Sequence, residues 1–171
     1  PDPAAVKWIN PGVERGVQRE VVATVGEGGG IWLLDRVTGE FLWAMPFPYD
    51  VPEFHIADIN VETGRTTLNW DSLFKQDGDR ILVCFHNARS FWSTAYDPTR
   101  NALYIPFHDA CLDMTANAST PSGFGPRSGV LRPGVNPDEY SAIAKVDLST
   151  GRMERIHVQA APGNGSALVT G

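Results

Sequence analysis

Two cysteines and two histidines lie at short spacings in the middle of the chain. Cys84-x-His86 and His108-x-x-Cys111 together hold the two thiolates and two imidazoles of a tetrahedral zinc site. The single residue between Cys84 and His86 is fewer than such sites usually have, and Cys84 ends an expected strand. A Cys84–Cys111 disulfide between neighbouring strands, formed in an oxidising compartment, is the second interpretation.

Other patterns that could support catalysis are weak. The chain has no Gly-x-Ser-x-Gly nucleophile motif, and His55, His86, His108 and His157 have no distinctive context. The segment Glu27-Gly-Gly-Gly30 lacks the Gly-Lys-Ser/Thr ending of a phosphate loop and precedes a strand. We interpret the histidines as surface or satisfied turn residues and the glycines as a flexible segment that lets the backbone approach a neighbour or a ligand closely.

The elements that must position these residues are short strands. Gly, Pro, Asn and Asp interrupt the sequence repeatedly, and no window sustains the apolar spacing of a helix. Apolar, β-branched and aromatic runs between the interruptions predict an all-β fold. The expected strands are Glu20–Thr24, Ile31–Asp35, Phe41–Ala44, Arg80–Cys84, Ser93–Tyr96, Ala102–Pro106, Ala142–Asp147 and Arg152–His157.

One turn pattern recurs between these strands. Asp35–Gly39, Asp97–Asn101 and Asp147–Gly151 each place an Asp four residues before a Gly or Asn, and Asn60–Gly64 is a looser copy. The carboxylate can accept backbone N–H groups inside the turn, while Gly or Asn adopts the left-handed conformation that reverses the chain. Each copy is therefore expected to be a hairpin, and their uneven spacing fits a propeller with loop insertions.

Two further segments have an expected structural role. Trp43 follows the first hairpin and is expected to pack between neighbouring sheets. The segment 115–140 holds eight Gly or Pro residues and is predicted to be a long loop, inserted either as a cover over a site or as a mobile surface segment.

Composition excludes several classes of protein. The 171 residues carry a net charge of −6 with scattered Lys and Arg, so no basic stripe is present and nucleic acid is not expected as a partner. The longest apolar runs are only a few residues long, which predicts that no segment spans a membrane. The chain begins without Met and ends on an apolar run, so we expect a fragment of a longer protein.

Three segments together resemble a known family. Gly29–Glu40, Ala95–Pro106 and Cys111–Met114 are similar, in the same order, to segments of the pyrroloquinoline-quinone (PQQ)-dependent alcohol dehydrogenases, the quinoprotein family. The similarity runs from about Val21 to the end of the chain. It implies that residues 1–171 are part of one eight-bladed β-propeller domain, contributing about three to four of its four-stranded antiparallel blades.

The resemblance also implies a function and a cofactor site. Family members oxidise an alcohol or sugar alcohol by hydride transfer to PQQ, which lies above a calcium or lanthanide ion. Matching the motifs places Glu27, Ser90, Phe91 and Trp92 at the cofactor face. The family's catalytic Asp and metal ligands precede the matched region, so no catalytic or metal residue is expected within this chain.

Further expectations follow from the same resemblance. The family links the corresponding strands by a disulfide, which favours a Cys84–Cys111 bond and a periplasmic location. The electron acceptor could be a cytochrome c, although this chain has no haem-binding Cys-x-x-Cys-His. Glu27 stands where the family has a basic residue, and Ser90 where it has Asn. These two departures favour the alternative of a non-catalytic propeller that acts as a binding or assembly scaffold.

Overall fold

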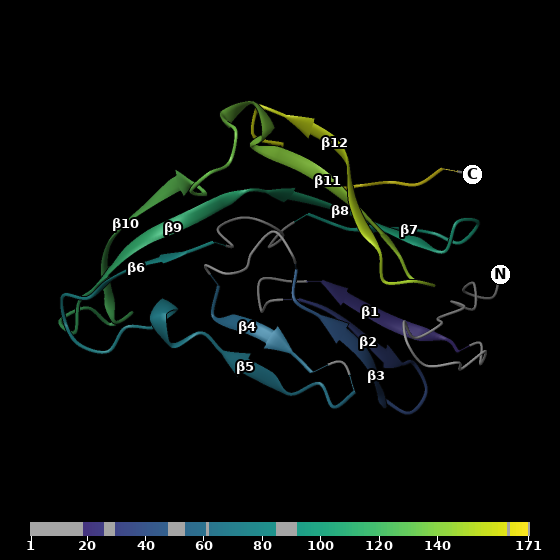
Figure 1. Ribbon diagram of the computed structural model, residues 1–171, viewed down its shortest axis with the longest axis horizontal. Helices are drawn as coiled ribbons and strands as arrows, with labels where there is room; N and C mark the ends of the chain where they lie inside the picture. The colour runs from purple at the N-terminus through teal and green to yellow at the C-terminus, as the bar shows by residue number, and fades with distance from the viewer. Residues whose placement is uncertain are drawn as a thin grey trace.

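The computed structural model describes residues 19–25, 30–47, 54–60, 62–84, 92–163 and 165–170. In these ranges the chain is almost entirely β-structure, which confirms the all-β expectation (Figure 1). The first strands are β1 (Val21–Val25), β2 (Ile31–Asp35), β3 (Phe41–Met45), β4 (Ile56–Ile59), β5 (Thr66–Leu68) and β6 (Arg80–Val83). The later strands are β7 (Ala95–Asp97), β8 (Ala102–His108), β9 (Ala110–Ala116), β10 (Phe124–Leu131), β11 (Ser141–Asp147) and β12 (Met153–Gln159). Two short 3-10 helices, η1 (Trp70–Ser72) and η2 (Pro137–Glu139), complete the described elements.

The strands form four antiparallel sheets within the described residues. Their strand orders are β1-β2-β3, β4-β5, β6-β9-β10 and β7-β8-β11-β12. Only the last has the four strands expected of a complete blade. Among the described residues the other three sheets have three, two and three strands, and in one of them β9 pairs with β6 and β10.

All four predicted hairpins are present. At the first, Asp35 Oδ1 accepts hydrogen bonds from the backbone N–H of Val37 and Thr38, both at 2.9 Å, and Gly39 has φ 73°. The same pair of bonds recurs at Asn60, Asp97 and Asp147, and the residues that close these turns, Gly64, Asn101 and Gly151, have φ of 68°, 50° and 72°. One local pattern thus sets the direction of eight strands.

The main core lies between the β1-β2-β3 sheet and the β7-β8-β11-β12 sheet, which face each other (Figure 1). Trp43 of β3 is 5% exposed and belongs to this core, as expected of a side chain between two sheets. Phe47 and Phe107 meet edge to face with ring centroids 5.1 Å apart. The other buried members are Ile31, Leu33, Leu103, Ile105, Ala142, Ala144, Val146 and Leu148.

The segment 115–140 is not the long loop that its composition predicts. It contains β10, which pairs with β9 from Phe124 opposite Ala116 to Leu131 opposite Ala110. The register shifts between Phe124 and Arg127, where Gly125 and Pro126 stand, and a bulge tolerates the missing N–H of proline. Pairing with β9 therefore overrides the low strand propensity of the sequence. The segment remains an insertion between β8 and β11, folded as a hairpin.

Candidate functional site

The structure describes one of the four predicted cofactor-facing residues. Glu27, Ser90 and Phe91 lie outside the described residues, whereas Trp92 is half-buried just before β7. The indole ring of Trp92 lies against the imidazole of His108, with ring centroids 4.6 Å apart. His108 ends β8 at the same end of the four-stranded sheet.

His108 is the middle of three aromatic rings. Its other neighbour is Tyr140, whose ring is stacked on the imidazole with a centroid distance of 5.0 Å. His108 is 7% exposed, and its Nε2 lies 3.0 Å from the carbonyl oxygen of Gly163. Because a carbonyl oxygen only accepts, Nε2 carries the hydrogen in this bond. Burial raises the pKa of the Tyr140 hydroxyl. We call Trp92, His108 and Tyr140 the aromatic row.

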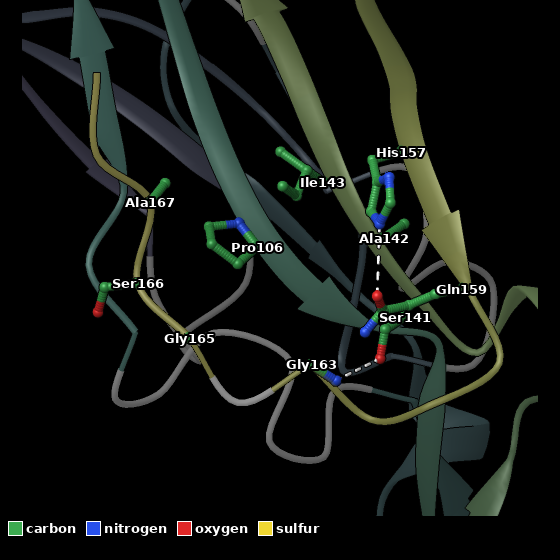
Figure 2. Close-up of a pocket in the computed structure, with 10 residues that line it drawn as sticks. All are labelled: Pro106, Ser141, Ala142, Ile143, His157, Gln159, Gly163, Gly165, Ser166 and Ala167. Carbon is green, nitrogen blue, oxygen red and sulfur yellow. Dashed lines mark hydrogen bonds between the residues drawn. The ribbon is translucent and has the colours of Figure 1, made fainter. Parts of the chain in front are cut away.

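The segment that follows β12 crosses the same end of the sheet. The backbone N–H of Gly163 donates to Ser141 Oγ at 2.8 Å (Figure 2). Further along, Ala167 N donates to Ser93 O and Ser93 N donates to Ser166 Oγ, both at 2.9 Å. The segment thus runs from the end of β12 to the start of β7 and fixes the residue that follows Trp92.

A pocket of about 240 Å³ lies between this segment and the sheet (Figure 2). Its wall on the sheet includes Pro106, Ile143 and His157, which stand opposite one another on β8, β11 and β12. The remaining lining residues are Ser141, Ala142, Gln159, Gly163, Gly165, Ser166 and Ala167. Proline, isoleucine and alanine side chains make most of the wall apolar, and Ser, Gln and His supply polar atoms at its edges.

Cys84 and Cys111 form a disulfide, which confirms the second interpretation of the cysteine and histidine pattern. Val83 of β6 pairs with Leu112 of β9, so the two cysteines stand opposite each other one step further along the same register. Both are buried. The bond uses both thiols, and the described residues contain no group of three or more His, Cys, Asp or Glu that could hold a metal ion, so the zinc interpretation was wrong.

A buried carboxylate directly follows His108 in the sequence and precedes Cys111 by two residues. Asp109 is the single residue between β8 and β9, and it is 2% exposed. Its Oδ2 accepts a hydrogen bond from Arg155 of β12, and its Oδ1 lies 3.6 Å from Arg132 Nη1. Arg155 also lies 3.8 Å from a Glu139 carboxylate oxygen and sits over the Phe107 ring, 5.4 Å from its centroid.

The close approach expected at Glu27-Gly-Gly-Gly30 occurs between two stretches of backbone. Gly30 has φ 97°, and a Cβ at this position would lie 2.7 Å from the carbonyl oxygen of Met45. Only glycine fits such a contact without movement of the backbone. Gly30 therefore lets β2 begin beside the end of β3.

Sequence reasoning missed Asp109 and Tyr140, and it considered His108 only as a zinc ligand or as a surface or satisfied turn residue, whereas the structure buries it at the end of β8. A signal was present, since His108-Asp109 interrupts an otherwise apolar stretch of strand two residues before a cysteine. Adjacent polar side chains in a buried strand need partners, and those partners come from residues 132–163, which sequence spacing does not bring together.

The described strands and sheets define the class of the protein as all-β. No protein-family model matches the chain. Its sequence is 30% identical over 96 residues to the quinohemoprotein alcohol dehydrogenase ADH-IIG of Pseudomonas putida, which covers 54% of this chain and 13% of that protein.

Three solved structures are similar to this chain in fold. A europium-containing methanol dehydrogenase matches 88% of this chain and 27% of its own, with a TM-score of 0.69 and 19% identity. The quinohemoprotein alcohol dehydrogenase ADHIIG from Pseudomonas putida HK5 matches 81% of this chain and 22% of its own, with a TM-score of 0.60 and 21% identity. The quinohemoprotein alcohol dehydrogenase from Comamonas testosteroni matches 88% and 24%, with a TM-score of 0.63 and 16% identity.

These comparisons confirm the resemblance to the PQQ-dependent alcohol dehydrogenases that the sequence motifs indicate. The structural matches show that the chain has the fold of part of their propeller. The chain spans about an eighth of the curated relative and about a quarter of the structural neighbours.

Proposed function

We propose that this chain is part of a PQQ-dependent quinoprotein dehydrogenase that oxidises an alcohol or sugar alcohol by hydride transfer to PQQ. The observation that carries the proposal is the 30% identity over 96 residues to a quinohemoprotein alcohol dehydrogenase. The Cys84–Cys111 disulfide, which the resemblance to the family implies, supports the same assignment.

Among the described residues, Trp92 is the one that we assign to contact with a planar quinone. Trp92 is half-buried, and the His108 ring, itself backed by Tyr140, supports its indole. A ring held in this way suits contact with a flat aromatic cofactor. When bound, PQQ would accept the hydride, which carries both electrons of the alcohol oxidation. Trp92 would hold it by ring contact, together with Glu27, Ser90 and Phe91, which lie outside the described residues. We place the ligands of the calcium or lanthanide ion outside this chain.

The location and the electron acceptor form part of the proposal. A structural disulfide persists in an oxidising compartment, which supports the periplasm. Within the described residues, no helix has the length and apolar character needed to cross a membrane. A cytochrome c is the proposed acceptor, because reduced PQQ must pass its electrons to another redox centre.

The alternative function is a binding or assembly scaffold without cofactor chemistry. Glu27 favours it, because a carboxylate beside the reactive quinone oxygens would oppose the negative charge that develops as the quinone is reduced. Ser90 favours it as well, since serine stands where the family has Asn.

Reconstitution of the complete protein distinguishes the two functions. It is incubated with PQQ and either Ca²⁺ or La³⁺, and reduction of an artificial dye is followed with a range of alcohols. We expect alcohol-dependent dye reduction that falls on Trp92→Leu and is unchanged on Trp70→Leu, since Trp70 is 66% exposed and distant in sequence from the aromatic row. A protein that retains no PQQ and reduces no dye with any alcohol would contradict the enzyme and support the scaffold.

A further inference from the structure

Asp109 and its two arginine partners form the most buried group of ion pairs among the described residues. The carboxylate is 2% exposed, and its partners Arg132 and Arg155 are 14% and 22% exposed. Most other ion pairs have at least one partner that is much more exposed, such as Arg80 with Asp113, where the arginine is 74% exposed. Removing three charges from water is costly, so a buried group of this kind contributes little net stability compared with apolar residues.

Since the ion pairs of Asp109 contribute little net stability, its contacts indicate a role in holding neighbouring segments in place. Its backbone N–H donates to the Tyr140 carbonyl at 2.8 Å, and its own carbonyl accepts from the Arg132 N–H at 3.2 Å. Its side chain binds Arg155 on β12. Asp109 therefore joins both ends of the 132–140 segment to the outer strand of the sheet, at the point where the chain leaves β8 for β9.

Asp109 is linked to two members of the aromatic row, to one by the peptide chain and to the other by a hydrogen bond. His108 is the residue before Asp109, and Tyr140 is the residue whose carbonyl Asp109 binds. Their rings are stacked, and Trp92 lies against His108. A shift of Asp109 would therefore move both residues that back Trp92.

We propose that Asp109 is a positioning residue, which sets the orientation of Trp92 through His108 and Tyr140 and so shapes the face that binds PQQ. The part of this inference that concerns PQQ rests on the proposed function. The part that concerns Trp92 does not, because it follows from contacts within the described chain.

The test uses the complete protein labelled with 5-fluorotryptophan, whose ¹⁹F resonances report the surroundings of each indole. Trp92→Phe assigns the Trp92 signal. Asp109→Asn keeps the size of the side chain and removes its charge. Asp113→Asn is the matched control, because Asp113 on β9 also binds an arginine, but its side chain is 22% exposed and that of its partner Arg80 is 74% exposed. We expect Asp109→Asn to move the Trp92 resonance and Asp113→Asn to leave it in place.

Affinity for PQQ, measured by equilibrium dialysis, gives the second readout. Asp109→Asn is expected to weaken binding about tenfold, and to have no further effect once Trp92 is replaced by Leu, because effects transmitted through one residue are not additive. If Asp109→Asn does not fold, Arg155→Lys replaces it, since lysine keeps the charge but loses the planar fork that binds a carboxylate.

The outcomes distinguish the effect of Asp109 on Trp92 from the binding of PQQ. An unchanged Trp92 resonance in a folded Asp109→Asn or Arg155→Lys protein overturns the proposal. A loss of PQQ affinity that persists in full without Trp92 also overturns it, because it shows a general structural role. If the wild-type protein binds no PQQ, the proposed function fails, while the Trp92 resonance still decides whether Asp109 positions that ring.

Discussion

The side chains that open the four hairpins share one role, which is to accept backbone N–H groups of the turn. Asp35, Asp97 and Asp147, and Asn60 in the fourth copy, accept two backbone N–H groups of the turn that follows. This is local chemistry within five residues, so sequence alone predicts it. Asn60 also shows that an amide oxygen suffices for the turn, which separates the capping role from the role of charge.

Asp97 should make the stability of the protein dependent on acid pH. The Arg100 guanidinium, which donates to Oδ2 at 2.8 Å, and the N–H groups of Arg100 and Thr99 hold the pKa of Asp97 below its usual 3.8. A lowered pKa in the folded state stabilises the protein above pH 3.8, and this contribution is lost as the pH falls through the folded value.

Asp97→Asn should therefore lower stability at neutral pH and flatten the loss of stability below pH 3.8, while keeping the turn. Urea denaturation of the complete protein at a series of pH values measures this. Asp71→Asn is the control, since its side chain is 95% exposed. Equal acid sensitivity of the Asp97→Asn and wild-type proteins would contradict the account.

At the scale of elements, strands between strong turn signals are predictable and strands defined by distant pairing are not. All eight expected strands are present, with ends that differ by at most two residues. β4, β5, β9 and β10 are not among the expected strands, although the Asn60–Gly64 turn predicts the hairpin that joins β4 to β5. β5 has only Thr66–Leu68, and β10 contains Gly, Pro and Ser that disfavour a strand until β9 pairs with it.

The disulfide between the end of β6 and β9 should stabilise the fold through the unfolded state. It closes a loop with a sequence separation of 27, for which chain entropy gives about 3.5 kcal/mol in the free energy of unfolding. Replacing both Cys84 and Cys111 with Ser should remove this amount, as measured by denaturation of the complete protein. Reductant should destabilise the wild type similarly and leave the double variant unchanged. A double variant as stable as the oxidised wild type would show that the bond contributes nothing.

At the scale of the whole molecule, facing sheets bury the apolar residues. Trp43 was expected between sheets because a large aromatic side chain followed a hairpin, and the structure confirms this. The candidate site was less predictable. Trp92 was identified by resemblance, but its support by His108, Tyr140 and Asp109 depends on tertiary contacts that join residues 92–109 to residues 132–163.

The packing of the sheets predicts that replacing Trp43 and replacing Trp70 lower the free energy of unfolding by different amounts. Trp43→Ala should lower the free energy of unfolding by about 3–5 kcal/mol, because it leaves a cavity between two sheets. Trp70→Ala should change it by less than about 0.5 kcal/mol, since Trp70 is 66% exposed. Denaturation of the two variants of the complete protein measures the difference. Similar values would show that the two sheets do not face each other in the complete protein.

A structure of the complete protein prepared with PQQ would show both the arrangement of the sheets and the place of the cofactor. We expect a ring of radial sheets in which the β7-β8-β11-β12 sheet has neighbours on both faces, with PQQ in contact with Trp92 and the disulfide intact. Substantial helix in this region, strands stacked as a closed sandwich, or PQQ bound away from Trp92 would contradict this expectation.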